Sequence, residues 1–133
     1  MTVKIYTIGY SGRTIQELQK IVTGADGSIL DIRISPKSRK AGFNKSQLER
    51  LFGNDYLWVP EFGNAALGEG GRRLHDPALG LDMIKAIYED SIADEWNGAI
   101  FLMCVCREYD HCHRRQVAEL LREHGYTVEE WQD

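Results

Sequence analysis

The stretch AIFLMCVCREYDHCHRR (99–115) contains the most hydrophobic run of the chain and, directly after it, a dense group of polar and thiol side chains. Its first part, AIFLMCV (99–105), has the length of a β-strand that is buried on both faces. Its second part, CREYDHCHRR (106–115), indicates the start of a helix, with Asp110 as the N-cap and an end near Gly125. The stretch therefore predicts a buried strand that leads into a helix through a chemically rich segment.

Strand and helix patterns alternate through the rest of the chain. Short β-branched and aromatic runs predict further strands at VKIYTI (3–8), SILDIRI (28–34), YLWV (56–59) and YTVEEW (126–131). Capping residues followed by apolar side chains at helical spacing predict helices that begin after Thr14, Asn44 and Asp76. This order, without repeats or a linker, predicts a single α/β domain over residues 1–133, a Rossmann-like three-layer fold with a mostly parallel β-sheet and helices on both faces.

A glycine-rich segment, EFGNAALGEGGRRLHD (61–76), separates the third predicted strand from the third predicted helix. It contains neither a P-loop nor a dinucleotide-binding glycine pattern. Its length without a secondary-structure pattern is typical of a lid or a binding loop, and equally of a flexible surface connection. The sequence leaves both roles open.

Composition and charge are those of an ordinary globular protein. The 133 residues are 43% hydrophobic and 27% charged, with a formal net charge of −4, and a chain of this length can bury a core without metals or disulfides. The acidic balance disfavours a broad surface that coats nucleic acid, although it leaves room for a local basic cluster. No run is long and apolar enough for a membrane helix, and the first residues lack a signal-peptide pattern. We therefore expect a cytoplasmic protein without a membrane partner.

Polar side chains follow three of the predicted strands. They lie in GYSGRT (9–14), in Asp31 and Arg33 with the following SPKSR (35–39), and in CREYDHCHRR (106–115). In open parallel sheets, ligands bind beyond the carboxyl ends of the strands. If the first and fourth strands are neighbours, these segments converge, and the sequence predicts a site at that edge. Within SPKSR, Lys37 is expected to be a surface charge.

Cys112, His113 and Arg114 would lie in the first turn of the helix that Asp110 caps. The positive end of a helix stabilises a thiolate and binds anions, and an arginine adds a bidentate clamp. The predicted catalytic residues are therefore Cys106, Glu108, Cys112 and His113. The predicted anion-binding residues are Arg33, Arg114, Ser11 and Ser38, with Asp31 and Tyr10 in a supporting role.

The three cysteines, all between residues 104 and 112, allow other interpretations. Cys104, inside the apolar run, is expected to be a buried and unreactive core residue. Cys106 and Cys112 could equally pack as small hydrophobic residues. Zinc is disfavoured because the spacing matches neither C-x2-C nor H-x3-H, so no metal or cofactor is predicted. A disulfide between Cys106 and Cys112 is sterically conceivable and would be catalytic or regulatory in a reducing compartment.

Four segments carry a resemblance to a known family. TIGYSGRT (7–14), DIRISPKSR (31–39), VPEFGN (59–64) and CREYDHCHRRQVA (106–118) resemble the successive motifs of the family catalogued as domain of unknown function 488. The resemblance implies a compact α/β domain, with Cys106, Glu108, Cys112, His113 and Arg114 in one signature and Asp31, Arg33, Pro36 and Ser38 in a second. Tyr10 stands where the family usually has histidine. The family has no established activity to carry over.

Three functions are compatible with these residues. The first is an enzyme that uses cysteine chemistry on an anionic ligand, such as a nucleotide, a phosphate ester or a nucleic-acid end. The second is a non-catalytic module that binds a nucleotide or a phosphorylated partner. The third is a thiol redox protein or sensor. The expected partner is an anionic small molecule or nucleotide, and the sequence does not indicate an oligomeric state.

Overall fold

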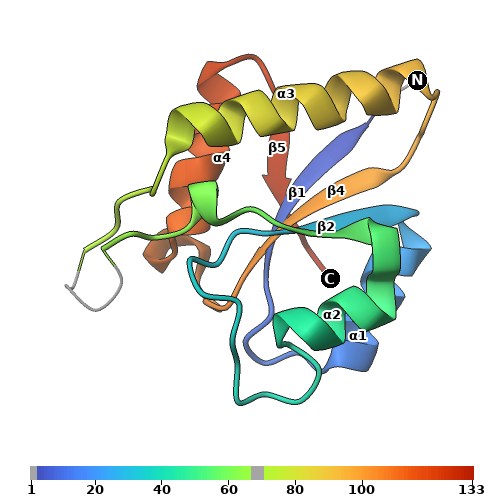
Figure 1. Ribbon diagram of the computed structural model, residues 1–133, viewed down its shortest axis with the longest axis vertical. Helices are drawn as coiled ribbons and strands as arrows, with labels where there is room; N and C mark the ends of the chain where they lie inside the picture. Colours follow the sequence, from blue (N-terminus) through green and yellow to red (C-terminus); the bar gives the residue numbers. More distant parts are fainter. Residues whose placement is uncertain (1–2, 67–70) are drawn as a thin grey trace.

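The computed structural model of the chain describes residues 3–66 and 71–133 (Figure 1). The strands are β1 (Lys4–Gly9), β2 (Gly27–Asp31), β3 (Tyr56–Trp58), β4 (Ala99–Cys104) and β5 (Val128–Glu130). The α-helices are α1 (Ile15–Gly24), α2 (Lys45–Phe52), α3 (Pro77–Ala93) and α4 (His113–Glu123), and short 3-10 turns are η1 (Gly53–Asp55), η2 (Pro60–Phe62) and η3 (Tyr109–His111). None of the helices in these two ranges has the length and apolar character needed to cross a bilayer.

The strands form one parallel sheet in the order β3-β2-β4-β1-β5. β4 lies at the centre, between β1 and β2, and all six of its residues are buried. The prediction from AIFLMCV of a doubly buried strand is therefore confirmed, with Val105 already exposed beyond its end. The predicted α/β fold with a parallel sheet is confirmed as well.

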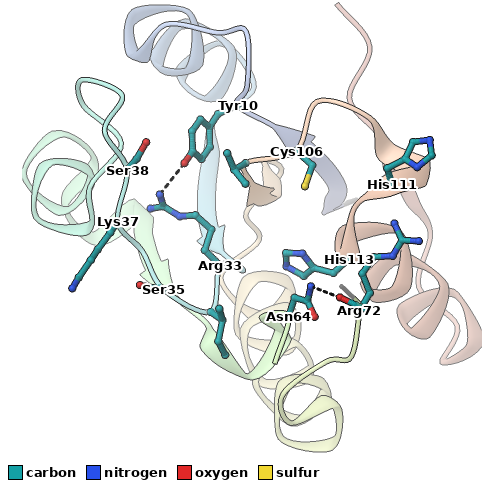
Figure 2. A pocket seen from close by; sticks show the side chains of 13 residues that line it. Tyr10, Arg33, Ser35, Lys37, Ser38, Asn64, Arg72, Cys106, His111 and His113 are labelled. Carbon is teal, nitrogen blue, oxygen red and sulfur yellow. Dashed lines mark hydrogen bonds between the residues drawn. The ribbon is translucent and has the colours of Figure 1, made fainter. Parts of the chain in front are cut away.

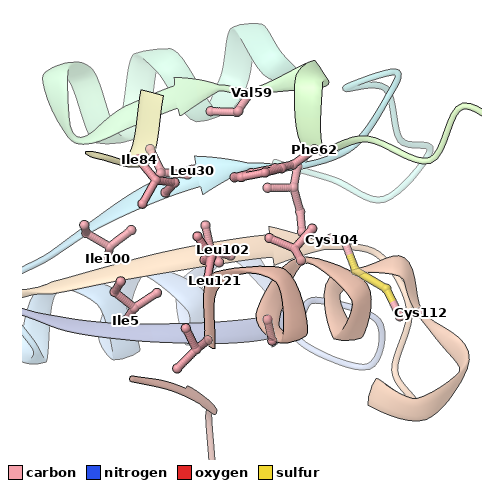
Figure 3. Close-up of a cluster of buried hydrophobic side chains, with 14 of the residues drawn as sticks. Ile5, Leu30, Val59, Phe62, Ile84, Ile100, Leu102, Cys104, Cys112 and Leu121 are labelled. Carbon is pink, nitrogen blue, oxygen red and sulfur yellow. A yellow bond between two sulfur atoms is a disulfide. The ribbon is translucent and has the colours of Figure 1, made fainter. Parts of the chain in front are cut away.

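Helices cover both faces of the sheet, and each face has its own hydrophobic core. One core packs Ile84 of α3 and Leu121 of α4 together with Leu102 of β4 (Figure 3). The other contains Leu18 of α1 and Leu48 of α2. Because side chains alternate along a strand, β4 contributes residues to both cores. This central position fixes where the chain after β4 emerges at the edge of the sheet.

Two of the predicted helix starts have the expected capping contacts. The Thr14 hydroxyl accepts a hydrogen bond from the Glu17 backbone N–H at 3.1 Å, and the Glu17 carboxylate accepts one from the Thr14 N–H at 3.4 Å. The Asp76 carboxylate accepts from the Leu79 N–H at 3.2 Å, with Pro77 as the first helical residue. These contacts satisfy backbone donors that the first turn of a helix leaves unpaired.

The start of α4 differs from the prediction. Asp110 lies in the turn η3, and the N-cap of α4 is Cys112. The prediction was wrong because Cys112 has an extended backbone, with φ −122° and ψ 146°, which separates η3 from α4. The Asp110 carboxylate instead lies 3.4 Å from Nη1 of Arg115 at the surface. His113 and Arg114 are therefore the first two residues of the helix.

The glycine-rich segment is described at its two ends, and residues 67–70, on which its predicted role as a lid or connection depends, lie outside the described residues. The side-chain oxygen of Asn64 accepts hydrogen bonds from the backbone N–H groups of Ala66 and Arg73. The side-chain amide of Asn64 donates to the carbonyl of Gly71. One buried asparagine therefore ties the two ends together.

Candidate functional site

The carboxyl ends of β1, β2 and β4 meet at a cavity of about 570 Å³ (Figure 2). Its volume lies within the range of small-molecule sites. The described lining comes from the segments after these three strands, the two ends of the glycine-rich segment, and the region around the start of α4: Tyr10, Arg33, Ile34, Ser35, Lys37, Ser38, Asn64, Gly71, Arg72, Val105, Cys106, His111 and His113. The predicted convergence of the three strand ends is confirmed, and of the first polar segment Tyr10 alone belongs to the described lining.

Arg33 lies on the cavity wall and is held there by two partners. The Asp31 carboxylate accepts from Nε at 2.8 Å and from Nη2 at 2.6 Å, and the Tyr10 hydroxyl accepts from Nη1 at 3.2 Å. Burial disfavours the charge, but the contacts with Asp31 and Tyr10 outweigh it and raise the pKa of Arg33, so the guanidinium stays charged. Asp31 also accepts from the Tyr56 hydroxyl, and burial, followed by this contact, raises the pKa of Tyr56.

The hydrogen bonds of Arg33 leave part of its binding capacity unused. A guanidinium has five N–H donors, and Arg33 directs three of them to Asp31 and Tyr10. The other two have no protein partner among the residues that the structure describes. Because Arg33 lines the cavity, these two donors are available to a ligand there.

His113 lies on another part of the cavity wall and has a defined tautomer. Its Nε2 lies 2.6 Å from the carbonyl oxygen of Ile32, and since a carbonyl can only accept, Nε2 carries the proton. Burial, with a smaller contribution from the charge of Arg114, lowers the pKa of His113 and keeps the ring neutral. Nδ1 therefore has a free lone pair, and it lies 3.8 Å from Sγ of Cys112.

The sulfur atoms of Cys104, Cys106 and Cys112 lie within 4.8 Å of one another at the end of β4. Cys104 and Cys112 are buried and joined as a disulfide (Figure 3). Cys106 is free, partly buried and lines the cavity. Cys112 is thus paired with Cys104, and the alternative pairing with Cys106, which the sequence left open, is not the one observed. The one free thiol among the three cysteines faces the candidate site.

Arg114 is fully buried and is not among the described residues that line the cavity. The Glu130 carboxylate accepts from Nε at 3.0 Å and from Nη2 at 2.6 Å. The carbonyls of Cys106 and Arg107 accept at 2.6 Å and 3.1 Å, and the sulfur of Cys104 lies 3.5 Å from Nη1. All five donors are used, so Arg114 fixes the chain after β4 against α4 and β5. This position differs from the expected contact with an anion.

The remaining predicted residues divide between the cavity and other surfaces. Ser38 lines the cavity. Ser11 is exposed and lines a separate depression of about 150 Å³. Glu108 is exposed, immediately before η3, and lies outside the described lining. The cavity therefore brings together five residues of the predicted set: Tyr10, Arg33, Ser38, Cys106 and His113.

Lys37 and Arg72 also line the cavity, although the sequence predicted a surface charge for Lys37 and did not single out Arg72. Both side chains are exposed, so no hydrophobic pattern marks them; their only signal is a position after a strand or inside the glycine-rich segment. With Arg33 they place three cationic residues around the cavity, and its described lining contains no carboxylate. The cavity is thus locally positive in a chain with a net charge of −4.

Comparison with known proteins identifies a family. The family model described as Domain of unknown function DUF488 matches residues 15–121, which is most of the chain. The matched range includes three of the four resembling segments in whole, and TIGYSGRT (7–14) precedes it. No match was found among curated proteins or among solved structures.

Proposed function

The chain belongs to the family described as domain of unknown function DUF488, and because that description names no activity, we propose a function from the cavity itself. The cavity binds a small phosphate-bearing anion, such as a nucleotide or a phosphate ester, and Cys106 is the group that reacts with it. The observation that carries this proposal is the cationic lining formed by Arg33, Lys37 and Arg72.

The charges around the cavity support an anionic ligand. Arg33 is held by Asp31, so its charge is partly compensated, yet two of its donors have no partner among the described residues. Lys37 and Arg72 have no ion pair within the described chain. A phosphate group with several acceptor oxygens matches such unused donors, and arginine binds it in a bidentate manner.

The Cys106 thiol supports an enzyme rather than a simple binding module. It is the most nucleophilic group of the described lining. In a displacement, its thiolate sulfur forms a bond to an electrophilic centre of the ligand while the leaving group departs and takes up a proton. Water then cleaves the covalent intermediate and restores the thiol. Cys112, buried and joined to Cys104, is excluded from this role while the disulfide persists.

Thermal unfolding in phosphate, pyrophosphate and nucleoside monophosphates tests the binding step, with chloride at matched ionic strength as the reference. A ligand at 100 times its Kd should stabilise the protein by about 2.7 kcal/mol. The double variant Lys37→Gln/Arg72→Gln should lose most of this stabilisation. The matched control Arg50→Gln/Lys85→Gln changes the net charge equally at exposed positions away from the described lining, and should retain it. Equal responses of both double variants would contradict the proposal.

Cys106→Ser separates the enzyme from a non-catalytic binding module. In an enzyme, this variant should keep the anion-dependent stabilisation and lose turnover of the ligand. A ligand that wild-type protein binds and never converts would instead support the binding module.

A thiol redox function is the second candidate, because a disulfide and a free thiol lie within one cluster of sulfurs. It is favoured if anions leave the melting temperature unchanged while Cys106 exchanges with disulfide reagents.

A further inference from the structure

The three sulfurs at the end of β4 form a cluster with a chemistry of its own. We propose that, when the Cys104–Cys112 disulfide is reduced, Cys104, Cys106, Cys112 and His113 bind one thiophilic divalent cation of the zinc class. Thiolate sulfur and imidazole nitrogen are the ligands that zinc takes in structural sites. This inference goes beyond the proposed anion binding and does not rest on it.

The positions of the sulfurs fit a common ion. The three Sγ atoms lie within 4.8 Å of one another. With Zn–S bonds of about 2.3 Å, a tetrahedral site places its sulfurs about 3.8 Å apart, so small side-chain rotations suffice. The Cα atoms of Cys104 and Cys112 are 7.9 Å apart, wider than the roughly 4.4–6.8 Å usual for disulfide partners. An ion between the two sulfurs suits this wider separation.

His113 adjoins the cluster of three sulfurs without belonging to it, and it is the fourth ligand in this proposal because it has the correct tautomer. Zinc-binding histidines usually donate their other ring N–H to a carbonyl or carboxylate, which orients the ring. His113 has this arrangement, because Nε2 donates to the Ile32 carbonyl at 2.6 Å. The lone pair of Nδ1 lies 3.8 Å from Sγ of Cys112, close to the separation of about 3.6 Å between a nitrogen and a sulfur ligand of tetrahedral zinc.

Arg114 provides the outer support that such a site needs. Three thiolates and a neutral imidazole around a divalent cation leave one negative charge in a buried location. Nη1 of Arg114 lies 3.5 Å from Sγ of Cys104 and also donates to the carbonyl of Cys106. Arg114 therefore supplies a positive charge, contacts the sulfur of one ligand and holds the backbone of another, which is the role of an outer hydrogen-bonding partner in metal sites.

The disulfide is the oxidised, metal-free form of the cluster in this proposal. A dithiol reductant transfers two electrons and two protons to the Cys104–Cys112 bond, giving two thiols, while the reductant itself becomes a disulfide. Binding of the cation then releases the protons of three thiols to solvent. The sequence disfavoured zinc because the number of residues between the cysteines matches no common zinc motif. In the folded chain, the end of β4 and the start of α4 bring the three sulfurs together although their spacing along the chain is unusual.

The test titrates the reduced full-length protein, freed of reductant without oxygen, with Co²⁺ as a spectroscopic probe and Zn²⁺ as a competitor. We expect one ion per chain by native mass spectrometry, and sulfur-to-cobalt charge-transfer absorption that Zn²⁺ abolishes. The oxidised protein should bind neither ion at this site. Cys106→Ser, at a partly exposed position, should weaken binding by more than about 100-fold, since the loss of an outer partner alone costs ~10–100-fold.

Two histidine variants complete the experiment. His113→Gln keeps a donor for the Ile32 carbonyl and removes the Nδ1 ligand, so binding should weaken while circular dichroism shows an intact fold. His124→Gln, at an exposed position on the far end of α4, should bind as wild type does. The proposal is overturned if the reduced protein binds no Co²⁺ or Zn²⁺, or if Cys106→Ser binds them as tightly as wild type.

Discussion

Arg33 and Arg114 lie at the same edge of the sheet, both are buried, and each forms a two-point ion pair with a carboxylate. Their remaining donors differ. Arg33 has two donors without a protein partner among the described residues and lines the cavity, whereas all five donors of Arg114 are used by the chain itself. Each carboxylate occupies two donors of its arginine, so the difference lies in the other three: two backbone carbonyls and a sulfur take them in Arg114, whereas the Tyr10 hydroxyl takes one of them in Arg33.

The two carboxylates also come from different distances along the chain. Asp31 precedes Arg33 by two residues, so the pair forms within one segment and presents its free side to the cavity. Glu130 lies sixteen residues after Arg114, in β5, whereas Arg114 lies in α4, so that pair links separate elements. The local pair leaves Arg33 buried on the wall of the cavity, while the long-range pair encloses Arg114 away from the described lining. This comparison leads to variants that affect stability and anion binding separately.

Arg114→Met should have the largest effect on stability. It leaves two backbone carbonyls without their donor and the Glu130 carboxylate with only the Thr7 hydroxyl, and breaking a buried ion pair costs about 3–5 kcal/mol. We expect the free energy of unfolding to fall by about 5 kcal/mol, near the upper end of this range, in urea denaturation monitored by circular dichroism. If this variant does not fold, Glu130→Gln, at a partly exposed position, gives a milder version of the same change.

The exposed neighbour Arg115 supplies the control for this loss. Arg115→Gln causes the same change in net charge at a surface position of α4, and its free energy of unfolding should stay close to that of wild type. In Glu130→Gln the anion-dependent stabilisation should persist. An Arg114→Met protein as stable as wild type would contradict the structural role of Arg114.

Arg33→Met should have a smaller effect on stability and a larger one on binding. The variant leaves Asp31 with the Tyr56 hydroxyl as its remaining side-chain donor, and we expect a loss near the lower end of the same range, about 3 kcal/mol. The stabilisation by phosphate should disappear because the cavity loses the two free donors. Replacing Asp31 by Asn in the same chain should recover part of the stability and none of the anion binding. If Arg33→Met still binds phosphate, Arg33 is not an anion-binding residue, and the proposed difference in role between Arg33 and Arg114 is wrong.

The difference between local and long-range contacts also explains which features of the fold could be predicted from the sequence. The alternation of strands and helices predicted the parallel sheet, and local caps such as Thr14 predicted helix starts, whereas the contact between β1 and β4 entered only as a condition. The site at the ends of these strands follows from their polar neighbours. Glu130 as the partner of Arg114 could not be predicted, because it arrives from a distant strand. Asp110 as the N-cap failed for a related reason, since Cys112 is held extended where its sulfur meets Cys104.

Tyr10→Phe should give the smallest effect and test how the free side of Arg33 is held. The hydroxyl of Tyr10 accepts from Nη1 of Arg33, while its ring stacks on Phe43 with the centroids 4.2 Å apart. Phenylalanine keeps the stacking and removes the acceptor, so the free energy of unfolding should fall by about 1 kcal/mol. The charge and the Asp31 contacts of Arg33 remain, and we therefore expect phosphate binding to weaken less than in Arg33→Met.

Tyr126→Phe is the matched control, because its hydroxyl makes no hydrogen bond with the described residues while its ring packs edge-on against Tyr88. Its stability and its response to phosphate should both remain close to those of wild type in parallel urea and thermal measurements. If Tyr10→Phe loses phosphate binding as completely as Arg33→Met does, the orientation of the Arg33 guanidinium, and not its charge alone, determines the affinity for the anion. Equal stability of the two phenylalanine variants would mean that Asp31 alone positions Arg33.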